Sequence, residues 1–166
     1  GEVFVNFKDL RDDPIDGDQY FQKIDTAGDP QWGEGVRLDL VDDIDFSARF
    51  TANTLGVVSV IWERGTFPDV DIFFQNLTSD GNYSLVEPLA ISNNLGYQFS
   101  PILSGNEQNG MYAIYADQGS GSIDLMVQKL SANFESEWGE TGLVAMKGLD
   151  GDVNYTQTYR LGDQSL

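Results

Sequence analysis

One short motif is written three times in this chain, as Asp18-Gln19-Tyr20-Phe21-Gln22-Lys23-Ile24, as Asp71-Ile72-Phe73-Phe74-Gln75-Asn76-Leu77 and as Asp124-Leu125-Met126-Val127-Gln128-Lys129-Leu130. Its aspartates lie 53 residues apart, and so do its glutamines. The same step leads from Trp32 to Leu85 and on to Trp138. A fixed long period is typical of stacked copies of one supersecondary unit, so the repeat predicts the architecture before any single residue is weighed.

The rest of each copy consists of short runs rich in β-branched and aromatic residues, with Gly, Asp, Asn and Pro clusters between them. We label these runs A to D. The B runs are 3–7, 57–62 and 111–115, the C runs 18–24, 71–77 and 124–130, the D runs 36–38, 88–91 and 143–146, and the A runs 46–51, 99–103 and 155–161. No long segment follows a helical period, so an all-β fold is predicted.

Four short antiparallel strands in a unit of about 50 residues are typical of a β-propeller blade. With run A innermost, the chain reads BCD-ABCD-ABCD-A, and the last run supplies the strand that the first unit lacks. The sequence therefore predicts a β-propeller or part of one, as a single domain over 1–166 with three four-stranded blades and units at about 1–55, 56–109 and 110–166.

Three blades are fewer than the usual four to eight. We therefore expect either further propeller repeats in the same chain or a second copy that exchanges its final strand and completes a ring. A different β stack, such as a solenoid or a sandwich, is the remaining alternative.

The repeat resembles a propeller-type repeat of large secreted and cell-surface proteins of bacteria, which reads approximately D-I-Y-x-Q-x-[LI]-D-x-x-G-x-x-x-W-x-x-x-G. The best copy, 18–35, has Gln22, Asp25, Gly28, Trp32 and Gly35 in place. The second copy has Leu85 for the tryptophan, and the third has Phe134 for the turn glycine. The resemblance implies an extracellular or cell-surface scaffold or binding protein, and it implies no catalytic residues.

The composition narrows the classes of partner. The chain carries 27 acidic residues against 9 basic ones, a net charge of −18, which should repel nucleic acid and anionic lipid surfaces. No apolar run approaches the ~18 residues of a membrane span, so no membrane insertion is expected. Without Cys or His, the chain has no thiolate or imidazole ligands and lacks the commonest general base.

Several aromatic and amide side chains are candidates for binding. Trp62 and Glu63 end a B run near a face of the predicted ring, which makes them the preferred ligand contacts. The repeated glutamine recurs at one phase of a strand, where its amide can bond to a neighbouring strand or loop, so we interpret it as structural. Trp32 and Trp138 are interpreted as apolar plugs at the blade edge, with sugar stacking as the sharper alternative.

The loop acids gather on one predicted face of the propeller. Such a face could bind Ca²⁺, which prefers carboxylate and carbonyl oxygens, or it could meet a basic partner. The metal-ligand candidates are Asp12, Asp13, Asp16, Asp39, Asp42, Asp43 and Asp45. None of these clusters fits the EF-hand loop, and the alternative is solvated turn acids that favour Asp and Gly for backbone reasons. No cofactor is required.

These observations favour a non-catalytic extracellular or cell-surface scaffold that binds a protein or a glycan through its acidic loop face. The first alternative is a structural subunit that builds a ring by strand exchange. The second is a glycosidase-like enzyme, since some propellers use paired carboxylates, for which Asp45, Asp152 and Glu63 are the available acids.

Overall fold

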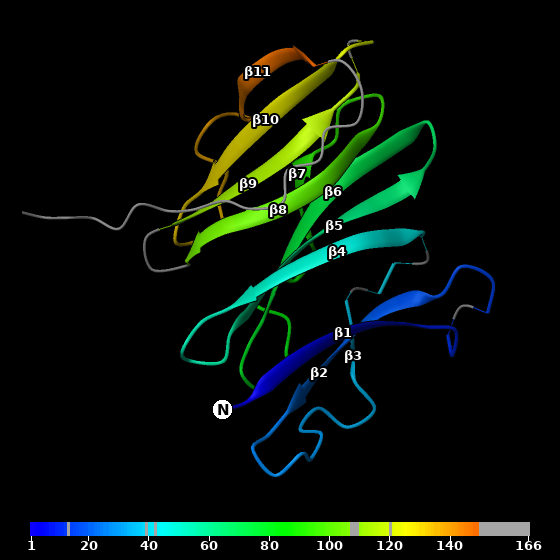
Figure 1. Ribbon diagram of the computed structural model, residues 1–166, viewed down its shortest axis with the longest axis vertical. Helices are drawn as coiled ribbons and strands as arrows, with labels where there is room; N and C mark the ends of the chain where they lie inside the picture. Colours follow the sequence, from blue (N-terminus) through cyan, green and yellow to red (C-terminus); the bar gives the residue numbers. More distant parts are fainter. Residues whose placement is uncertain (13, 39, 42, 107–109, 120, 150–166) are drawn as a thin grey trace, which may run out of the picture.

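The described part of the chain is built from strands alone (Figure 1). The structure is a computed structural model that describes residues 1–12, 14–38, 40–41, 43–106, 110–119 and 121–149. The strands are β1 (Val3–Asp9), β2 (Asp18–Ile24), β3 (Val36–Arg37), β4 (Asp45–Ala52), β5 (Val58–Thr66), β6 (Asp69–Leu77), β7 (Leu89–Ser92), β8 (Gln98–Asn106), β9 (Gly110–Asp117), β10 (Ile123–Leu130) and β11 (Leu143–Leu149). In these residues no helix is long and apolar enough to span a membrane.

The strands form three antiparallel sheets in which spatial order follows chain order. Sheet A is β1-β2-β3, sheet B is β4-β5-β6-β7 and sheet C is β8-β9-β10-β11. The predicted all-β class is confirmed, and so is the grouping of the runs as BCD, ABCD and ABCD. The predicted last strand, 155–161, lies outside the described residues.

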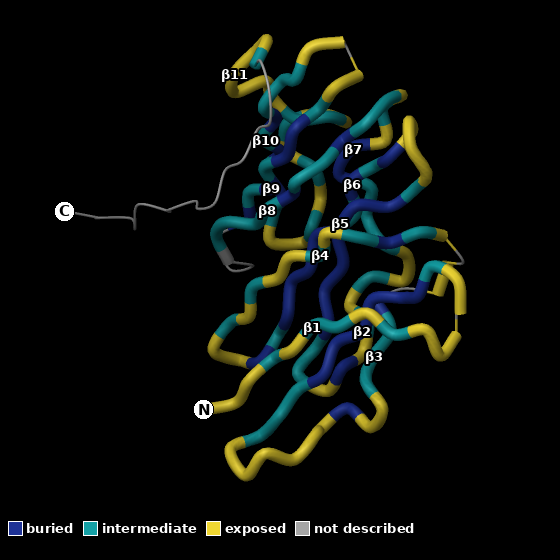
Figure 2. Tube along the Cα trace, turned by 45° about the vertical axis from the view of Figure 1, so that its right-hand side comes forward, coloured by how far each residue is buried: buried dark blue, intermediate teal, exposed yellow. Residues whose placement is uncertain are grey.

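The sheets pack face to face, with sheet A and sheet C at opposite ends and sheet B between them (Figures 1 and 2). One core joins sheets A and B through side chains such as Phe21, Leu38, Val60 and Trp62. A second core joins sheets B and C, and the Phe74 ring packs there against the tilted ring of Phe134 with ring centroids 5.4 Å apart. Sheet B is therefore buried on both sides, which explains the nearly continuous apolar run in β5.

Strand registers repeat with the sequence. Gln75 lies opposite Val60 in sheet B, and Gln128 lies opposite Ala113 in sheet C, one repeat step further on. In sheet A, Gln22 lies opposite Val5, because the connection between β1 and β2 is two residues longer than the repeat requires. Equivalent positions therefore pair alike in sheets B and C, whereas in sheet A the partner on β1 is shifted by two residues.

The repeated glutamine holds the loop that follows its own strand. Gln22 Nε2 donates to the Gly33 carbonyl at 2.9 Å, and its Oε1 accepts from the Trp32 N–H at 2.9 Å. Gln128 makes the same pair of bonds with Gly139 and Trp138, at 2.7 Å and 3.1 Å. The glutamine satisfies loop backbone groups that no strand could reach, and it fixes the C–D loop relative to the sheet.

The turn at the start of this loop is also shared. Asp25, Thr78 and Ser131 occupy one position, and each side chain accepts a bond from the N–H four residues on. Three residues after each of them the backbone has a positive φ, of 93° at Gly28, 79° at Gly81 and 61° at Phe134. Phe134 tolerates this conformation, which is costly for a bulky residue, while its ring packs on Phe74.

Candidate functional site

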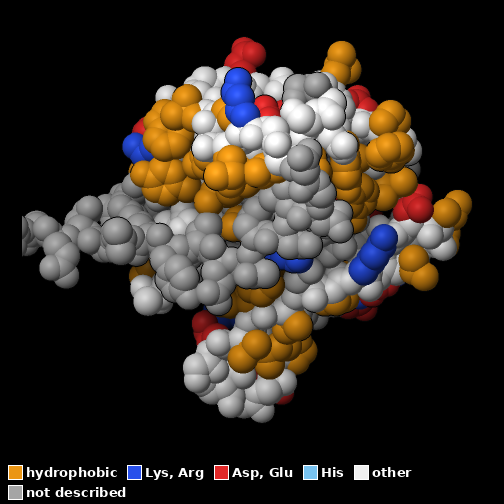
Figure 3. Space-filling view, turned by 45° about the horizontal axis from the view of Figure 1, so that its top comes forward, with side chains coloured by type: hydrophobic (Ala, Val, Ile, Leu, Met, Phe, Trp, Pro, Cys, Tyr) orange, Lys and Arg blue, Asp and Glu red, His pale blue; other side chains and the backbone are white. Residues whose placement is uncertain are grey.

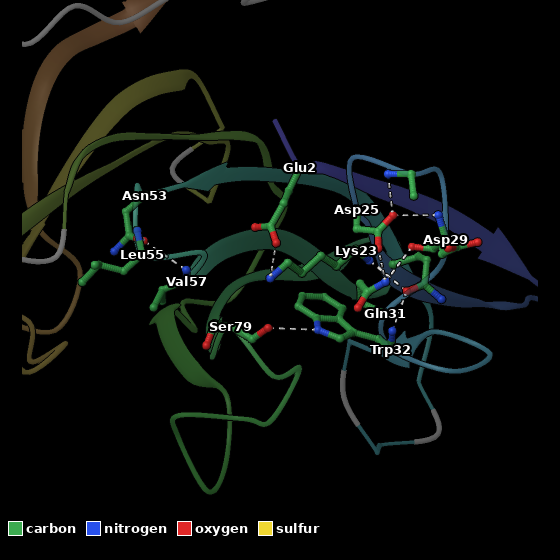
Figure 4. Close-up of polar contacts among 12 residues, drawn as sticks. Glu2, Lys23, Asp25, Asp29, Gln31, Trp32, Asn53, Leu55, Val57 and Ser79 are labelled. Atoms are coloured by element: carbon green, nitrogen blue, oxygen red, sulfur yellow. Dashed lines mark hydrogen bonds and ion pairs between the residues drawn. The ribbon is translucent and has the colours of Figure 1, made fainter.

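Polar contacts between the C–D loops fasten each sheet to the next. Trp32 Nε1, on the loop of sheet A, donates to the Ser79 carbonyl of sheet B at 3.2 Å, as Figure 4 shows. Tyr83 reaches back and donates its hydroxyl to the Arg37 carbonyl at 2.8 Å. Trp32 is 8% exposed, so the interpretation of this residue as a plug is the one that the geometry supports. These contacts define the outer rim between sheets A and B.

Among the described residues one groove lies between sheets A and B and a second lies between sheets B and C. The first has a volume of about 230 Å³ and is lined by Leu40, Val41, Gln75, Tyr83, Val86, Glu87 and Pro88. The second has a volume of about 520 Å³ and is lined by Ala90, Asn93, Ser136, Gly139 and Glu140. The lining positions correspond one repeat step apart, as Leu40 and Asn93, Tyr83 and Ser136, Val86 and Gly139, and Glu87 and Glu140. The second groove therefore has a serine and a glycine where the first has Tyr83 and Val86.

The exchange of Tyr83 for Ser136 changes the chemistry of the site most. In the first groove the Tyr83 ring fills space and its hydroxyl bonds to sheet A. In the second groove a serine hydroxyl and the Asn93 amide take the places of Tyr83 and Leu40, and Glu140 keeps the carboxylate that Glu87 supplies in the first. Hydroxyl, amide and carboxylate groups around an open groove can bond to a polar, hydroxyl-rich ligand.

The predicted ligand contacts Trp62 and Glu63 lie in the interior. Trp62 is fully buried, and its Nε1 donates to Asp45 Oδ1 at 2.8 Å. Glu63 is 3% exposed, and its Oε1 accepts from the Ser100 N–H of β8 at 2.9 Å. Trp62 faces sheet A and Glu63 faces sheet C, so both side chains join sheets and neither offers surface to a ligand.

A charged group is buried in the joint between sheets A and B. Asp45 Oδ1 accepts from Arg64 Nε at 3.2 Å, and the Arg64 guanidinium lies over the Phe73 ring at 4.2 Å. Burial raises the pKa of Asp45 to about 7 and lowers the pKa of Arg64 to about 10. Burial, together with the charges of Asp69 and Asp43, raises the pKa of Asp71 to about 6. Removing a carboxylate from water disfavours its charged form.

Among the described residues, the predicted metal-ligand acids do not form one cluster. Asp12 accepts a bond from the Tyr20 hydroxyl, Asp43 is exposed, and Asp45 pairs with Arg64. Asp16 is half-buried beside these turns. Asp13, Asp39 and Asp42 lie outside the described residues. Within the part of the chain that the structure describes, no three acids are arranged to hold a metal ion.

Comparison of the chain with protein-family models, with curated proteins and with solved structures finds no match in any of the three. Sequence reasoning missed the grooves, although one signal was present: Tyr83 and Ser136 stand one repeat step apart and differ strongly in size.

Proposed function

We propose that this chain is a non-catalytic binding scaffold whose second groove, between sheets B and C, binds a saccharide. The carrying observation is that this groove, at about 520 Å³, is larger than its equivalent of about 230 Å³ and is lined by Asn93, Ser136 and Glu140. A site that departs from its own repeat pattern is the place where a repeat scaffold gains an individual function.

The finer fold belongs to the same proposal: the three sheets are blades of a β-propeller or of part of one. Support comes from the strand order within each sheet, from the repeated registers and from the face-to-face packing. The extracellular or cell-surface location that we propose depends only on the resemblance of the repeat to exported propeller proteins.

A saccharide fits the groove better than the other ligand classes considered. The net charge of −18 opposes phosphorylated and other anionic ligands, and Glu140 at the groove adds to this effect. Neutral hydroxyl groups can donate to the Glu140 carboxylate and to the Asn93 carbonyl oxygen, and they can accept from the Ser136 hydroxyl. A protein ligand is the runner-up, and it would use the same polar rim.

The bonds of the interior acids support the non-catalytic proposal. Of the three candidates for glycosidase chemistry, Asp45 bonds to Trp62 and Arg64, and Glu63 bonds to the Ser100 N–H of β8. The third, Asp152, lies outside the described residues. A pair of catalytic carboxylates must instead flank a bond of a bound substrate.

The experiment is a glycan array followed by calorimetry, with Ser136→Tyr as the test variant because it rebuilds the tyrosine of the first groove. We expect this variant to lose at least tenfold in affinity for the glycan that the unaltered chain binds. Ser84→Tyr is the matched control, since Ser84 is exposed and lines neither groove. Absence of any glycan binding by the unaltered chain would refute the saccharide, and equal affinity of Ser136→Tyr would refute the site.

A further inference from the structure

Each joint between sheets is made by two unlike faces. The forward face of a sheet points to the next sheet along the chain. In sheet A it carries Phe21 and, opposite it on β3, Val36, and in sheet B it carries Phe74 and, opposite it on β7, Leu89. All four side chains belong to the two cores. The matching pair in sheet C is Val127 and Leu143, and Leu143 is 53% exposed.

The rearward face of a sheet points to the preceding sheet. In sheet B it carries Val58, Val60 and Trp62, all fully buried, and in sheet C it carries Met111, Ala113 and Tyr115, also fully buried. The ladder registers place Val3, Val5 and Phe7 at the matching positions of sheet A. There Val3 is 58% exposed and Val5 is 42% exposed.

The exposed faces at the two ends of the stack therefore correspond to the two unlike faces that meet in each joint inside the chain. Sheet C offers a forward face that lacks a following sheet among the described residues, and sheet A offers a rearward face that lacks a preceding one. Hydrophobic side chains gather over the end of the molecule that comes forward in Figure 3, around scattered charged groups. Met146, opposite Leu125 on the forward face of sheet C, is 55% exposed.

We propose that the forward face of sheet C docks on the rearward face of sheet A in a second copy of this chain. Two such joints relate two copies by a two-fold axis and close a ring of six sheets, within the usual four to eight blades of a propeller. The A-to-B and B-to-C joints inside one chain already pair these same two kinds of face, and the proposed contact continues that series. This inference does not depend on the saccharide site.

Charge sets how the pairing responds to salt. Each copy carries a net charge of −18, so two copies repel one another at low ionic strength. The docking faces themselves are mainly apolar, and the salt-sensitive term is this overall repulsion. We therefore expect association to strengthen between low and high NaCl, opposite to a contact held by salt bridges.

Sedimentation velocity from about 1 µM to about 200 µM tests the proposal, because a dimer that forms by mass action responds to concentration. Leu143→Lys and Val5→Glu each place a charge on one face, at side chains already exposed in the single chain. Each variant should weaken dimerisation at least tenfold. Leu55→Glu is the control, since Leu55 is 69% exposed at the tip of the β4–β5 turn, and it should dimerise like the unaltered chain. Circular dichroism verifies that every variant is folded.

A mixture of the two variants tests whether sheet C of one copy docks on sheet A of the other. In a mixture of Leu143→Lys and Val5→Glu, one joint pairs the new lysine with the new glutamate and the other joint is unaltered, so mixed dimers should form where neither variant dimerises alone. A chain that stays monomeric over the whole range overturns the proposal. A dimer weakened by Leu143→Lys but not by Val5→Glu also overturns it, because sheet C would then pair with itself. A monomer whose β11 amides are protected at every concentration would identify residues 150–166 as the cover instead.

Discussion

At the scale of single residues, the bonds of the repeated glutamine to the loop backbone explain why this side chain recurs in every copy. Gln75 is 1% exposed, and its amide bonds to both backbone groups of Leu85, at 3.0 Å and 3.1 Å. Its Oε1 also accepts from the Asn76 N–H at 2.9 Å. A single side chain thereby replaces the ladder partners that a loop lacks, and buried backbone groups left without partners are costly.

The first prediction follows from these bonds. Gln75→Leu keeps the approximate volume but removes all three bonds, so the free energy of unfolding should fall by about 2–4 kcal/mol. Urea denaturation measures the change. Gln118→Leu is the control, because Gln118 is exposed and bonds to Tyr97 through its backbone N–H, and it should change stability by less than about 0.5 kcal/mol. A loss at Gln75 as small as that of the control would contradict the role assigned to the amide.

The second prediction concerns pH and Asp71. Its pKa is raised from the ordinary 3.8 to about 6 by burial and by Asp69 and Asp43, so the folded chain keeps a proton that the unfolded chain has released. The stabilising contribution is therefore complete below about pH 4 and is lost as the pH rises through about 6. Asp71→Asn should remove this fall and, on the order of 1 kcal/mol, stabilise the chain at pH 8.

Denaturation at pH 5 and at pH 8 measures that difference. The variant's stability is compared with that of the unaltered chain at the same pH. If Asp71→Asn and the unaltered chain lose stability equally between the two pH values, the burial of this carboxylate is not what sets its titration.

At the scale of elements, the C–D turns are where one sheet touches the next. A Cβ at Gly81 would lie 3.0 Å from the Trp32 ring and from Val36, whereas a Cβ at Gly28 would meet open space. Both glycines have a positive φ, of 79° and 93°. Both positions therefore require a left-handed backbone, but only a side chain at Gly81 would contact the neighbouring sheet.

The third prediction uses this pair. Gly28→Ala should cost about 1 kcal/mol of stability from the left-handed backbone alone. Gly81→Ala should cost a further 1–3 kcal/mol, roughly, because it overpacks the joint between sheets A and B. Thermal or urea unfolding of both variants gives the difference. Equal costs would mean that the Trp32 ring moves aside freely.

Strand positions were predictable because each B and C run alternates or concentrates β-branched and aromatic residues between turn clusters. The structural role of Gln22, Gln75 and Gln128 was likewise predictable from their common phase. The interior position of Trp62 and Glu63 was not, since β5 continues to Thr66 beyond the predicted end of the run, and the burial of its side chains depends on sheets distant in sequence. The grooves depend on the size of side chains across a joint, and the signal for them in the sequence is the size difference between Tyr83 and Ser136 at equivalent positions.

At the scale of the whole molecule, sheet B packs against a hydrophobic core on each of its faces, whereas sheets A and C each pack against one core. Figure 2 shows buried chain along β5 and β6 and exposed chain at β11. Local opening should therefore cost most in the middle of the stack, because opening there disrupts packing on two sides.

The fourth prediction is a gradient of amide hydrogen exchange. Amides of β5 and β6 should exchange most slowly, and those of β11 should exchange fastest among the paired strands at low protein concentration. Mass spectrometry of peptides covering each strand measures the rates. Equal protection in β5 and β11 under these conditions would contradict the unequal burial of the three sheets.

The unlike faces of each sheet also bear on how such a chain can change in evolution. A duplication or loss of one whole copy would place a forward face against a rearward face again, so every remaining seam would still match. Loss of part of a copy would remove strands from one sheet and leave apolar surface of the neighbouring sheet without its counterpart. Viable length variants of this protein are therefore expected to differ by complete copies.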